Sequence, residues 1–332
     1  MNLTFELNKI SKYRTPLMGI SAILIILCHA NLYDIAVGIN VKKLLSLGNV
    51  GVDIFLFLSG IGCYYSLNRG GGDLLKWYKK RFLRIFIPYT LAQIPFWGFY
   101  IIYGDFDLAD SLYEYSTLAF WIRHTGMWYI ALLIPLYFVT PFLYMLFEKT
   151  KRRLRLAVFL MLVVLILCNV EIIIYNRLAM EIISNIQWAL VRTVTFILGI
   201  ALAPAVKENI KVNGIYIILG TLLLIGILRL FGIGYYWCLF AVMILFFIYF
   251  IELLEYKGKA ILFFNFMGII SLESYLFNGY VRYVFMDLPI YTSKSILFYG
   301  HYIDYFLIFI VGTILSYLIN KISTYIFRKV DL

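Results

Sequence analysis

The chain has 332 residues, of which 63% are hydrophobic and 14% are charged, and its mean hydropathy is +0.88. A soluble domain carries about 25% charged residues, so this composition excludes a soluble globular protein and is typical of a polytopic membrane protein. The formal net charge is +11. We attribute that charge to membrane topology and contact with anionic membrane lipid, and we expect no nucleic-acid partner.

The apolar runs predict an all-α, polytopic membrane helix bundle of about ten transmembrane helices, forming a single integral-membrane domain over residues 1–332. Each run approaches the roughly 20 residues that cross a bilayer as helix. The first residues, MNLTFELNKISKYR, are polar and do not resemble a cleavable signal peptide, so we expect the first span to act as a signal anchor. The predicted spans are 17–36, 48–67, 85–104, 126–147, 156–175, 186–206, 213–231, 235–253, 261–283 and 303–326.

The basic residues are distributed unevenly over the predicted loops. With the N-terminus in the cytoplasm, the cytoplasmic segments hold 21 Lys and Arg residues and the outer segments hold 5. This asymmetry follows the positive-inside rule. It predicts that the N-terminus and the C-terminus are both cytoplasmic and that the loop 105–125 lies outside.

The first predicted span contains His29. No Lys, Arg or Glu occurs between Leu17 and Val37, so an ionisable ring lies within an otherwise apolar helix, about 18 Å from the cytoplasmic side at 1.5 Å per residue. An ionisable side chain at such a depth is costly and indicates a functional site. The alternative is a structural hydrogen bond between His29 and a neighbouring helix.

Four further charged residues fall in later spans, namely Asp53, Glu171, Arg192 and Glu273. Their predicted depths place all of them in one layer with His29, in the outer half of the membrane. Charges there are expected to face the bundle interior and to pair. We expect Asp53 or Glu273 to fix the tautomer of the His29 ring. A purely structural ion-pair network is the alternative.

The third predicted span begins with a basic cluster in the segment WYKKRFLRIFIPY, residues 77–89. Arg81 and Arg84 are three residues apart and therefore lie on one helical face. Forked guanidinium groups near a helix N-terminus suit the phosphates of an anionic ligand. Ordinary snorkelling of basic side chains towards lipid headgroups is the alternative.

The cysteines give no sign of metal binding. Each of the four lies in an apolar run, and none has metal-ligand spacing or forms a disulfide framework. We expect small core side chains and no metal site. These residues are Cys28, Cys63, Cys168 and Cys238.

An ordered set of motifs resembles the integral-membrane acyltransferase-3 family across nearly the whole chain. The set begins with the segment from Gly19 to His29 and continues with Gly51-Val-Asp-Ile-Phe-Leu-Phe-Leu-Ser-Gly60. It then includes Arg81-Phe-Leu-Arg84-Ile-Phe-Ile-Pro88-Tyr89, Met127-Trp-Tyr-Ile-Ala131 and Ser271-Leu-Glu-Ser-Tyr-Leu-Phe-Asn278. Asn278 stands where the family commonly has His.

The resemblance implies an O-acyltransferase of the cell envelope, in the bacterial cytoplasmic membrane. Members of the family typically move an acetyl or other short acyl group from cytoplasmic acyl coenzyme A to a hydroxyl of a cell-surface or lipid-linked saccharide. Acetyl coenzyme A is then the donor substrate. By the same resemblance, His29 is catalytic and Arg81 with Arg84 holds coenzyme A. We expect the acceptor to meet Trp128, Arg192 and Asn278, and Asp53 and Glu273 to assist His29.

One position departs from the family pattern. The family usually has an Arg eleven residues before its His, and Met18 occupies that place here. Arg14 lies one helical turn earlier, on the same face. We therefore expect the side chain of Arg14 to reach the position left by Met18 and to help bind coenzyme A, provided that Pro16 allows a helix there.

A transporter or flippase of lipid-linked sugars is the alternative function, because intramembrane charges can also bind cargo. Such a protein has no need of an Arg pair for coenzyme A at the cytoplasmic face. The sequence leaves open the acyl chain, the acceptor, the oligomeric state and whether His29 is acylated or acts only as a base.

Overall fold

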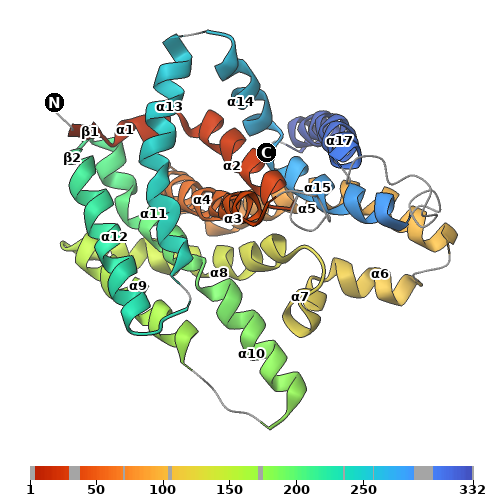
Figure 1. Cartoon of the computed structure of the whole chain (residues 1–332), viewed down its shortest axis with the longest axis horizontal. Helices are drawn as coiled ribbons and strands as arrows, with labels where there is room; N and C mark the ends of the chain where they lie inside the picture. Colours follow the sequence, from red (N-terminus) through yellow and green to blue (C-terminus); the bar gives the residue numbers. More distant parts are fainter. Residues whose placement is uncertain are drawn as a thin grey trace.

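The structure is a computed structural model, and it describes residues 4–29, 38–69, 72–103, 107–170, 175–234, 236–256, 258–287 and 302–330. The described chain is almost entirely helical (Figure 1). Among the predicted polar residues of the spans, Glu171 lies outside the described residues.

The helices follow one another along the chain with short connections, and two three-residue strands form the only sheet in the described part. The elements are β1 (Thr4–Glu6), α1 (Asn8–Lys12), α2 (Arg14–His29), α3 (Ile39–Ser46), η2 (Leu47–Asn49), α4 (Val50–Arg69), α5 (Leu74–Tyr103), α6 (Leu108–Tyr115), α7 (Leu118–Arg123), α8 (Trp128–Lys149), α9 (Arg153–Asn169), α10 (Arg177–Leu190), α11 (Thr193–Lys207), β2 (Lys211–Asn213), α12 (Gly214–Leu230), η3 (Trp237–Met243), α13 (Ile244–Tyr256), α14 (Ala260–Ile269), α15 (Ser271–Asp287) and α17 (Tyr302–Lys329).

The prediction of an all-α membrane bundle is confirmed. Within the described residues, six helices are long and apolar enough to cross a membrane, and a bent pair of helices raises that number to seven. Two shorter apolar helices, α2 and α12, add to these. The predicted number of ten spans and the cytoplasmic location of the termini stay predictions.

The centre of the bundle is built on glycines that let backbones touch. The helices α4 and α11 pack through Gly60 and Gly199 (Figure 1). A Cβ added to Gly199 would lie 2.2 Å from the carbonyl oxygen of Phe57, and one added to Gly60 would lie 2.3 Å from that of Phe196. Because helices in lipid associate through close packing of small residues, these contacts fix α4 against α11.

A second glycine pair joins α2 to α14. A Cβ on Gly19 would lie 1.9 Å from the carbonyl oxygen of Phe264, and one on Gly268 would lie 1.9 Å from that of Thr15. Immediately after this contact the chain turns by 76° between α14 and α15, so the span predicted over 261–283 is broken rather than continuous. The break places the first residue of α15, Ser271, inside the bundle, where it is buried.

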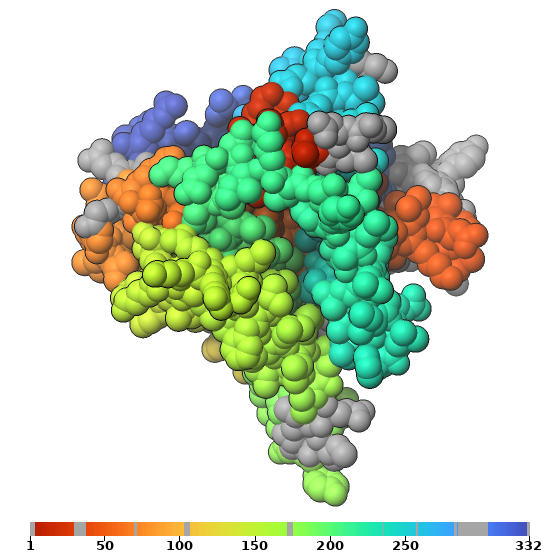
Figure 2. Space-filling model, turned by 90° about the vertical axis from the view of Figure 1, so that its left-hand side faces the viewer, coloured from red at the N-terminus to blue at the C-terminus, as the bar shows by residue number. Residues whose placement is uncertain are grey.

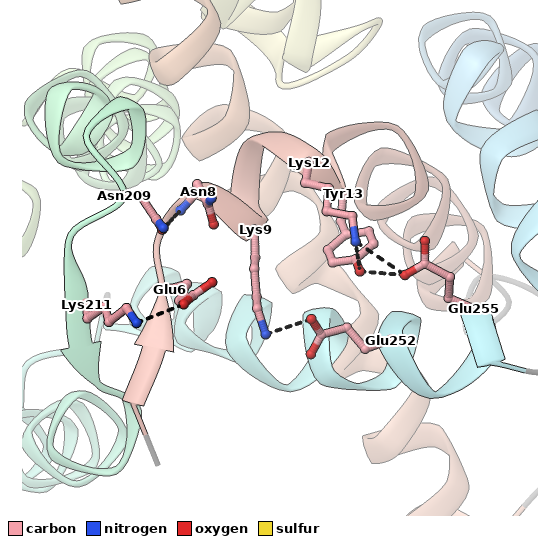
Figure 3. A network of polar contacts seen from close by, with 9 residues as sticks. All are labelled: Glu6, Asn8, Lys9, Lys12, Tyr13, Asn209, Lys211, Glu252 and Glu255. Carbon is pink, nitrogen blue, oxygen red and sulfur yellow. Dashed lines mark hydrogen bonds and ion pairs between the residues drawn. The ribbon is translucent and has the colours of Figure 1, made fainter. Parts of the chain in front are cut away.

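The N-terminal segment is fastened to two distant parts of the chain (Figure 3). Strand β1 pairs antiparallel with β2, and the Lys211 ammonium lies 3.1 Å from the Glu6 carboxylate. The Lys9 ammonium lies 2.7 Å from the carboxylate of Glu252, on α13. In the space-filling view the N-terminal residues (red) accordingly sit between the green chain near residue 210 and the cyan chain near residue 260 (Figure 2).

The same network continues to the start of α2. Tyr13 donates a hydrogen bond of 2.6 Å to the Glu255 carboxylate, and Lys12 donates one of 2.6 Å to the Tyr13 hydroxyl (Figure 3). The hydrogen bond with Tyr13 is the main cause that raises the pKa of Lys12, against a smaller lowering by desolvation. These contacts hold the segment directly before Arg14 in place.

Candidate active site

His29 is the last residue of α2 and is half-buried against α15. Its Nδ1 lies 2.6 Å from the Nδ2 atom of Asn278, which is buried on α15. One turn earlier on α2, the Ile26 carbonyl accepts a hydrogen bond from the hydroxyl of Tyr305, on α17. The ring is thus held at the meeting point of three helices. Asn278, which we predicted to meet the acceptor, touches His29 itself.

The contact with Asn278 bears on which nitrogen of the ring carries the proton. An amide N–H that donates to Nδ1 leaves the proton of a neutral ring on Nε2. When the same amide is turned over, its carbonyl accepts from Nδ1–H and Nε2 has the free lone pair of a base. The tautomer of His29 therefore follows the orientation of the Asn278 amide, and in the structure the amide nitrogen faces Nδ1.

Asp53 does not contact His29, contrary to the expectation that it fixes the tautomer. The side chains of Asp53 and Arg192 are fully buried and form an ion pair between α4 and the first residue before α11. In the packing of α4 on α2, Gly51 faces the Ser21 carbonyl and Gly48 faces the Leu24 carbonyl. This register sets Asp53 beside α2, but its carboxylate is paired with Arg192 and not with the ring of His29.

Three tryptophans surround the guanidinium of Arg192. Its central carbon lies 3.7 Å from the ring centroid of Trp237, 5.7 Å from that of Trp188 and 5.9 Å from that of Trp128. Cations over aromatic faces are stabilised by the ring quadrupole, most strongly when water is excluded. Trp128 and Arg192, both predicted to meet the acceptor, are therefore brought together.

Glu273 is also bound elsewhere. It is buried on α15, and its Oε1 accepts a hydrogen bond of 3.1 Å from the amide of Asn320, on α17. The expected contact between Glu273 and His29 is not formed. The reason is tertiary, because α17 brings an amide next to this carboxylate while α15 presents Asn278, five residues later, to the histidine.

The predicted coenzyme A residues do converge. A cavity of about 180 Å³, here called the arginine cavity, is lined by three arginines and by five residues that carry a hydroxyl group. Its lining consists of Arg14, Met18, Phe55, Ser59, Arg81, Arg84, Ile85, Tyr129, Leu133, Tyr137, Ser271, Leu272 and Tyr275.

Arg81 points into the bundle and not towards lipid. Its Nη2 donates hydrogen bonds of 2.8 Å to the Gly62 carbonyl and 2.5 Å to the Ser66 hydroxyl, both on α4, and the guanidinium lies over the ring of Trp77. Arg84 is exposed at the rim. The side chain of Arg81 therefore does not extend towards lipid headgroups, as the snorkelling alternative would require.

Arg14 and Met18 line the same cavity, one helical turn apart. The helix α2 begins at Arg14, and Pro16 falls in its first turn, where the missing N–H costs nothing. The Nε of Arg14 is buried and has no hydrogen-bond partner in the described residues. Arg14 and Met18 therefore face the same cavity, and the replacement of the usual arginine by Arg14 stays a prediction.

Sequence reasoning missed the aromatic side chains around both sets of charges, including Tyr129, Tyr275, Trp188 and Trp237. In a chain with 28 Tyr and 28 Phe, an aromatic residue in an apolar run carries no signal that separates a cavity wall from the core. The tryptophans Trp188 and Trp237 are 49 residues apart and become neighbours only through packing, with ring centroids 6.4 Å apart.

Comparison with known proteins gives a family match. A family model described as an acyltransferase domain matches residues 17–321, which is most of the chain. No curated protein and no solved structure gives a significant match.

Proposed function

The chain belongs to the acyltransferase-3 family and is a multi-pass membrane acyltransferase. From that premise we propose that it moves an acetyl or other short acyl group from cytoplasmic acyl coenzyme A to a hydroxyl of a saccharide of the cell envelope. His29 acts on the acceptor hydroxyl. Arg14, Arg81 and Arg84 bind the anionic part of coenzyme A.

The observation that carries the proposal is the polar face of α15. Ser271 and Tyr275 line the arginine cavity, and Asn278, one turn beyond Tyr275, touches His29. Residues three and four apart lie on one face of a helix, so these three side chains form one row. Acyl coenzyme A held by the arginines would therefore have a path for its thioester arm that leads along α15 to the histidine.

Two side chains that line the arginine cavity, those of Tyr129 and Tyr275, hold each other in place. Tyr275 on α15 accepts a hydrogen bond of 3.1 Å from the backbone N–H of Tyr129, at the beginning of α8. The rings of Tyr129 and Tyr275 lie 5.3 Å apart, edge to face. This contact fixes α8 against α15 at the arginine cavity, which favours transfer because the donor is positioned before it reacts.

The proposed reaction is a direct acyl transfer. The acceptor oxygen attacks the thioester carbonyl carbon, a C–O bond forms and the C–S bond breaks. His29 takes the proton of the hydroxyl as a general base, and the departing thiolate then receives a proton to give free coenzyme A. In the structure the Asn278 amide nitrogen faces Nδ1, so this step requires the amide to be turned over; its carbonyl then accepts from Nδ1–H and Nε2 is the basic nitrogen.

The test is hydrolysis of acetyl coenzyme A by the purified protein in the absence of an acceptor. We expect slow release of acetate by the wild-type protein. His29→Ala should lower this rate by about 10²–10⁴-fold, which is the usual contribution of a general base. Its affinity for coenzyme A, measured by calorimetric titration, should stay unchanged, because the ring meets the acyl end of the donor.

A second histidine supplies the control. His124 bonds to Asn185 through a 2.8 Å contact and lines no part of the arginine cavity, so His124→Ala should hydrolyse at the wild-type rate. A folded His29→Ala protein with near-normal hydrolysis would exclude His29 from the reaction. Asn278→Asp should retain most activity because its carboxylate also accepts from Nδ1–H, whereas Asn278→Leu should lose it.

A further inference from the structure

A second cavity, of about 370 Å³, lies between the beginning of α4, the junction of α10 with α11, and η3. We call it the tryptophan cavity. Its walls hold five apolar side chains, three of them aromatic, and four polar or charged ones. They consist of Ser46, Leu47, Asn49, Val50, Asp53, Trp188, Arg192, Trp237 and Phe240.

The tryptophan cavity lies at the opposite end of the bundle from the N-terminal network. The helices α4, α11 and α13 begin beside it and end at the face that carries β1 and β2 (Figure 1). If that face is cytoplasmic, as the positive-inside rule predicts, the tryptophan cavity belongs to the outer half of the protein.

The cavity is also a close neighbour of the histidine end of α2. The Cys28 thiol contacts the carbonyl oxygen of Ser46 at 3.6 Å, and Ser46 belongs to the cavity wall. Cys28 directly precedes His29. A molecule seated in the tryptophan cavity is therefore separated from the His29 segment only by η2 and the residue before it.

The ion pair in the wall is incompletely satisfied. Oδ1 of Asp53, together with Nε and Nη2 of Arg192, is buried and has no hydrogen-bond partner among the described residues. Buried polar atoms are nearly always hydrogen-bonded, so each such atom calls for a partner. A molecule in the cavity would satisfy these atoms if it supplied one hydrogen-bond donor to Asp53 and hydrogen-bond acceptors to Arg192.

The need for both a donor and acceptors restricts the class of ligand that can fill the cavity. An anion would meet the free oxygen of Asp53, and a cation would meet the guanidinium of Arg192, so either is disfavoured. A neutral molecule with adjacent hydroxyl groups satisfies both, because a hydroxyl donates and accepts at once. Trp188 and Trp237 both line the cavity, so aromatic ring atoms lie where the C–H side of such a molecule would sit.

We infer that the tryptophan cavity binds a pyranose ring of the acceptor saccharide. The inference rests on the proposed acyl transfer to a saccharide and adds where the sugar sits. Trp188 and Trp237, whose ring centroids lie 6.4 Å apart, lie against one side of the sugar, and Asp53 with Arg192 receives its hydroxyl groups. The ion pair is then a recognition element and not only a structural link between α4 and α11.

The experiment uses the full-length protein in detergent and three neutral probes, namely methyl glucopyranoside, methyl rhamnopyranoside and N-acetylglucosamine. Saturation-transfer NMR measures their binding, and hydrolysis of acetyl coenzyme A is followed in parallel. We expect at least one pyranoside to bind the wild-type protein, and Trp188→Leu to weaken that binding tenfold or more. Coenzyme A affinity and hydrolysis without a sugar are measured on the same variants.

Trp97→Leu, on α5 and outside the cavity wall, is the matched control and should bind the sugar normally. The assignment is overturned if no pyranoside binds the wild-type protein, or if Trp188→Leu and Trp97→Leu bind it equally well, which would leave a hydrated structural ion pair. Hydrolysis and coenzyme A binding are measured separately from sugar binding. If the wild-type protein neither hydrolyses acetyl coenzyme A nor binds coenzyme A, the result contradicts the proposed function and not the sugar site. A Trp188→Leu protein that fails to fold is replaced by Asn49→Ala, on the same wall, for which the same tenfold loss is expected.

Discussion

At the residue scale, the three arginines of the arginine cavity are held in different ways. Arg81 donates two hydrogen bonds to α4, Arg84 is exposed at the rim, and the Nε of Arg14 has no partner in the described residues. A guanidinium without a protein partner is available for a phosphate, to which it can donate two parallel hydrogen bonds. Arg14 and Arg84 are therefore the side chains best placed to respond to an anionic ligand.

Replacing Arg81 and Arg84 together by Ala should weaken the binding of coenzyme A. Hydrogen bonds to charged groups contribute about 1.5–3 kcal/mol each, so the loss should reach roughly tenfold or more in affinity. Calorimetric titration with coenzyme A measures it. Unchanged affinity in the folded double variant would contradict the assignment of this pair to the coenzyme.

Arg14→Ala tests whether Arg14 replaces the arginine that the family usually has at the position of Met18. We expect both coenzyme A affinity and acyl transfer to fall at least tenfold, because a charge-assisted contact is lost. Lys149→Ala is the control, since Lys149 is an exposed basic residue at the end of α8 that does not line the cavity. If the two variants behave alike, Arg14 contributes only to the positive charge that orients the protein in the membrane.

At the element scale, close helix contacts decide which side chains can meet. The contact of Gly199 with the Phe57 carbonyl sets α11 against α4, and with it the distance between Arg192 and Asp53. The 76° turn after α14 similarly sets Ser271 and Tyr275 against the arginine cavity. No proline lies between Ala260 and Asp287, so the usual sequence sign of a broken helix is missing there.

The variant Gly199→Ala should destabilise the protein, because its Cβ would lie 2.2 Å from backbone and one of the two helices must move. Overpacking of this kind costs about 1–3 kcal/mol. Gly220→Ala, in α12, is the matched control, since nothing lies within 4 Å of a Cβ there. Thermal unfolding in detergent should show a lower midpoint for Gly199→Ala than for the wild-type protein and an unchanged midpoint for Gly220→Ala. Equal midpoints would contradict the role of the α4–α11 contact.

At the scale of the whole molecule, contacts join several of the segments predicted to be cytoplasmic. Strand β1 near the N-terminus pairs with β2 after α11, and Lys9 reaches Glu252 near the end of α13. Tyr65, near the end of α4, donates to the Ala203 carbonyl near the end of α11. The distribution of basic residues and the packing of the helices therefore assign these segments to one face.

Labelling in intact cells tests the orientation of that face. A single cysteine placed at Lys151, in a chain whose native cysteines are replaced, should resist a membrane-impermeant thiol reagent, because the positive-inside rule puts this loop in the cytoplasm. A cysteine at Asp110 should react. Strong labelling at position 151 would reverse the orientation and remove the arginine cavity from the side on which coenzyme A is made available.

Much of this protein is determined by its sequence alone. The lengths of the apolar runs predicted a membrane helix bundle, and the spacing of Arg81 and Arg84 placed them together on one face. His29 stood out because an ionisable ring interrupts an apolar run. These properties depend on neighbouring residues along the chain, and a helix preserves such local order in space.

The partners of the polar groups were decided only by the tertiary structure. Asp53 pairs with Arg192, Glu273 with Asn320 and His29 with Asn278, although the sequence was equally compatible with Asp53 or Glu273 beside His29. Each partner comes from a different helix. The crossing of α2, α4, α11 and α15 is set by glycine contacts and by a helix break that no local pattern marks. Many pairings of buried charges satisfy the same hydrophobic pattern, and only the relative placement of whole helices selects one of them.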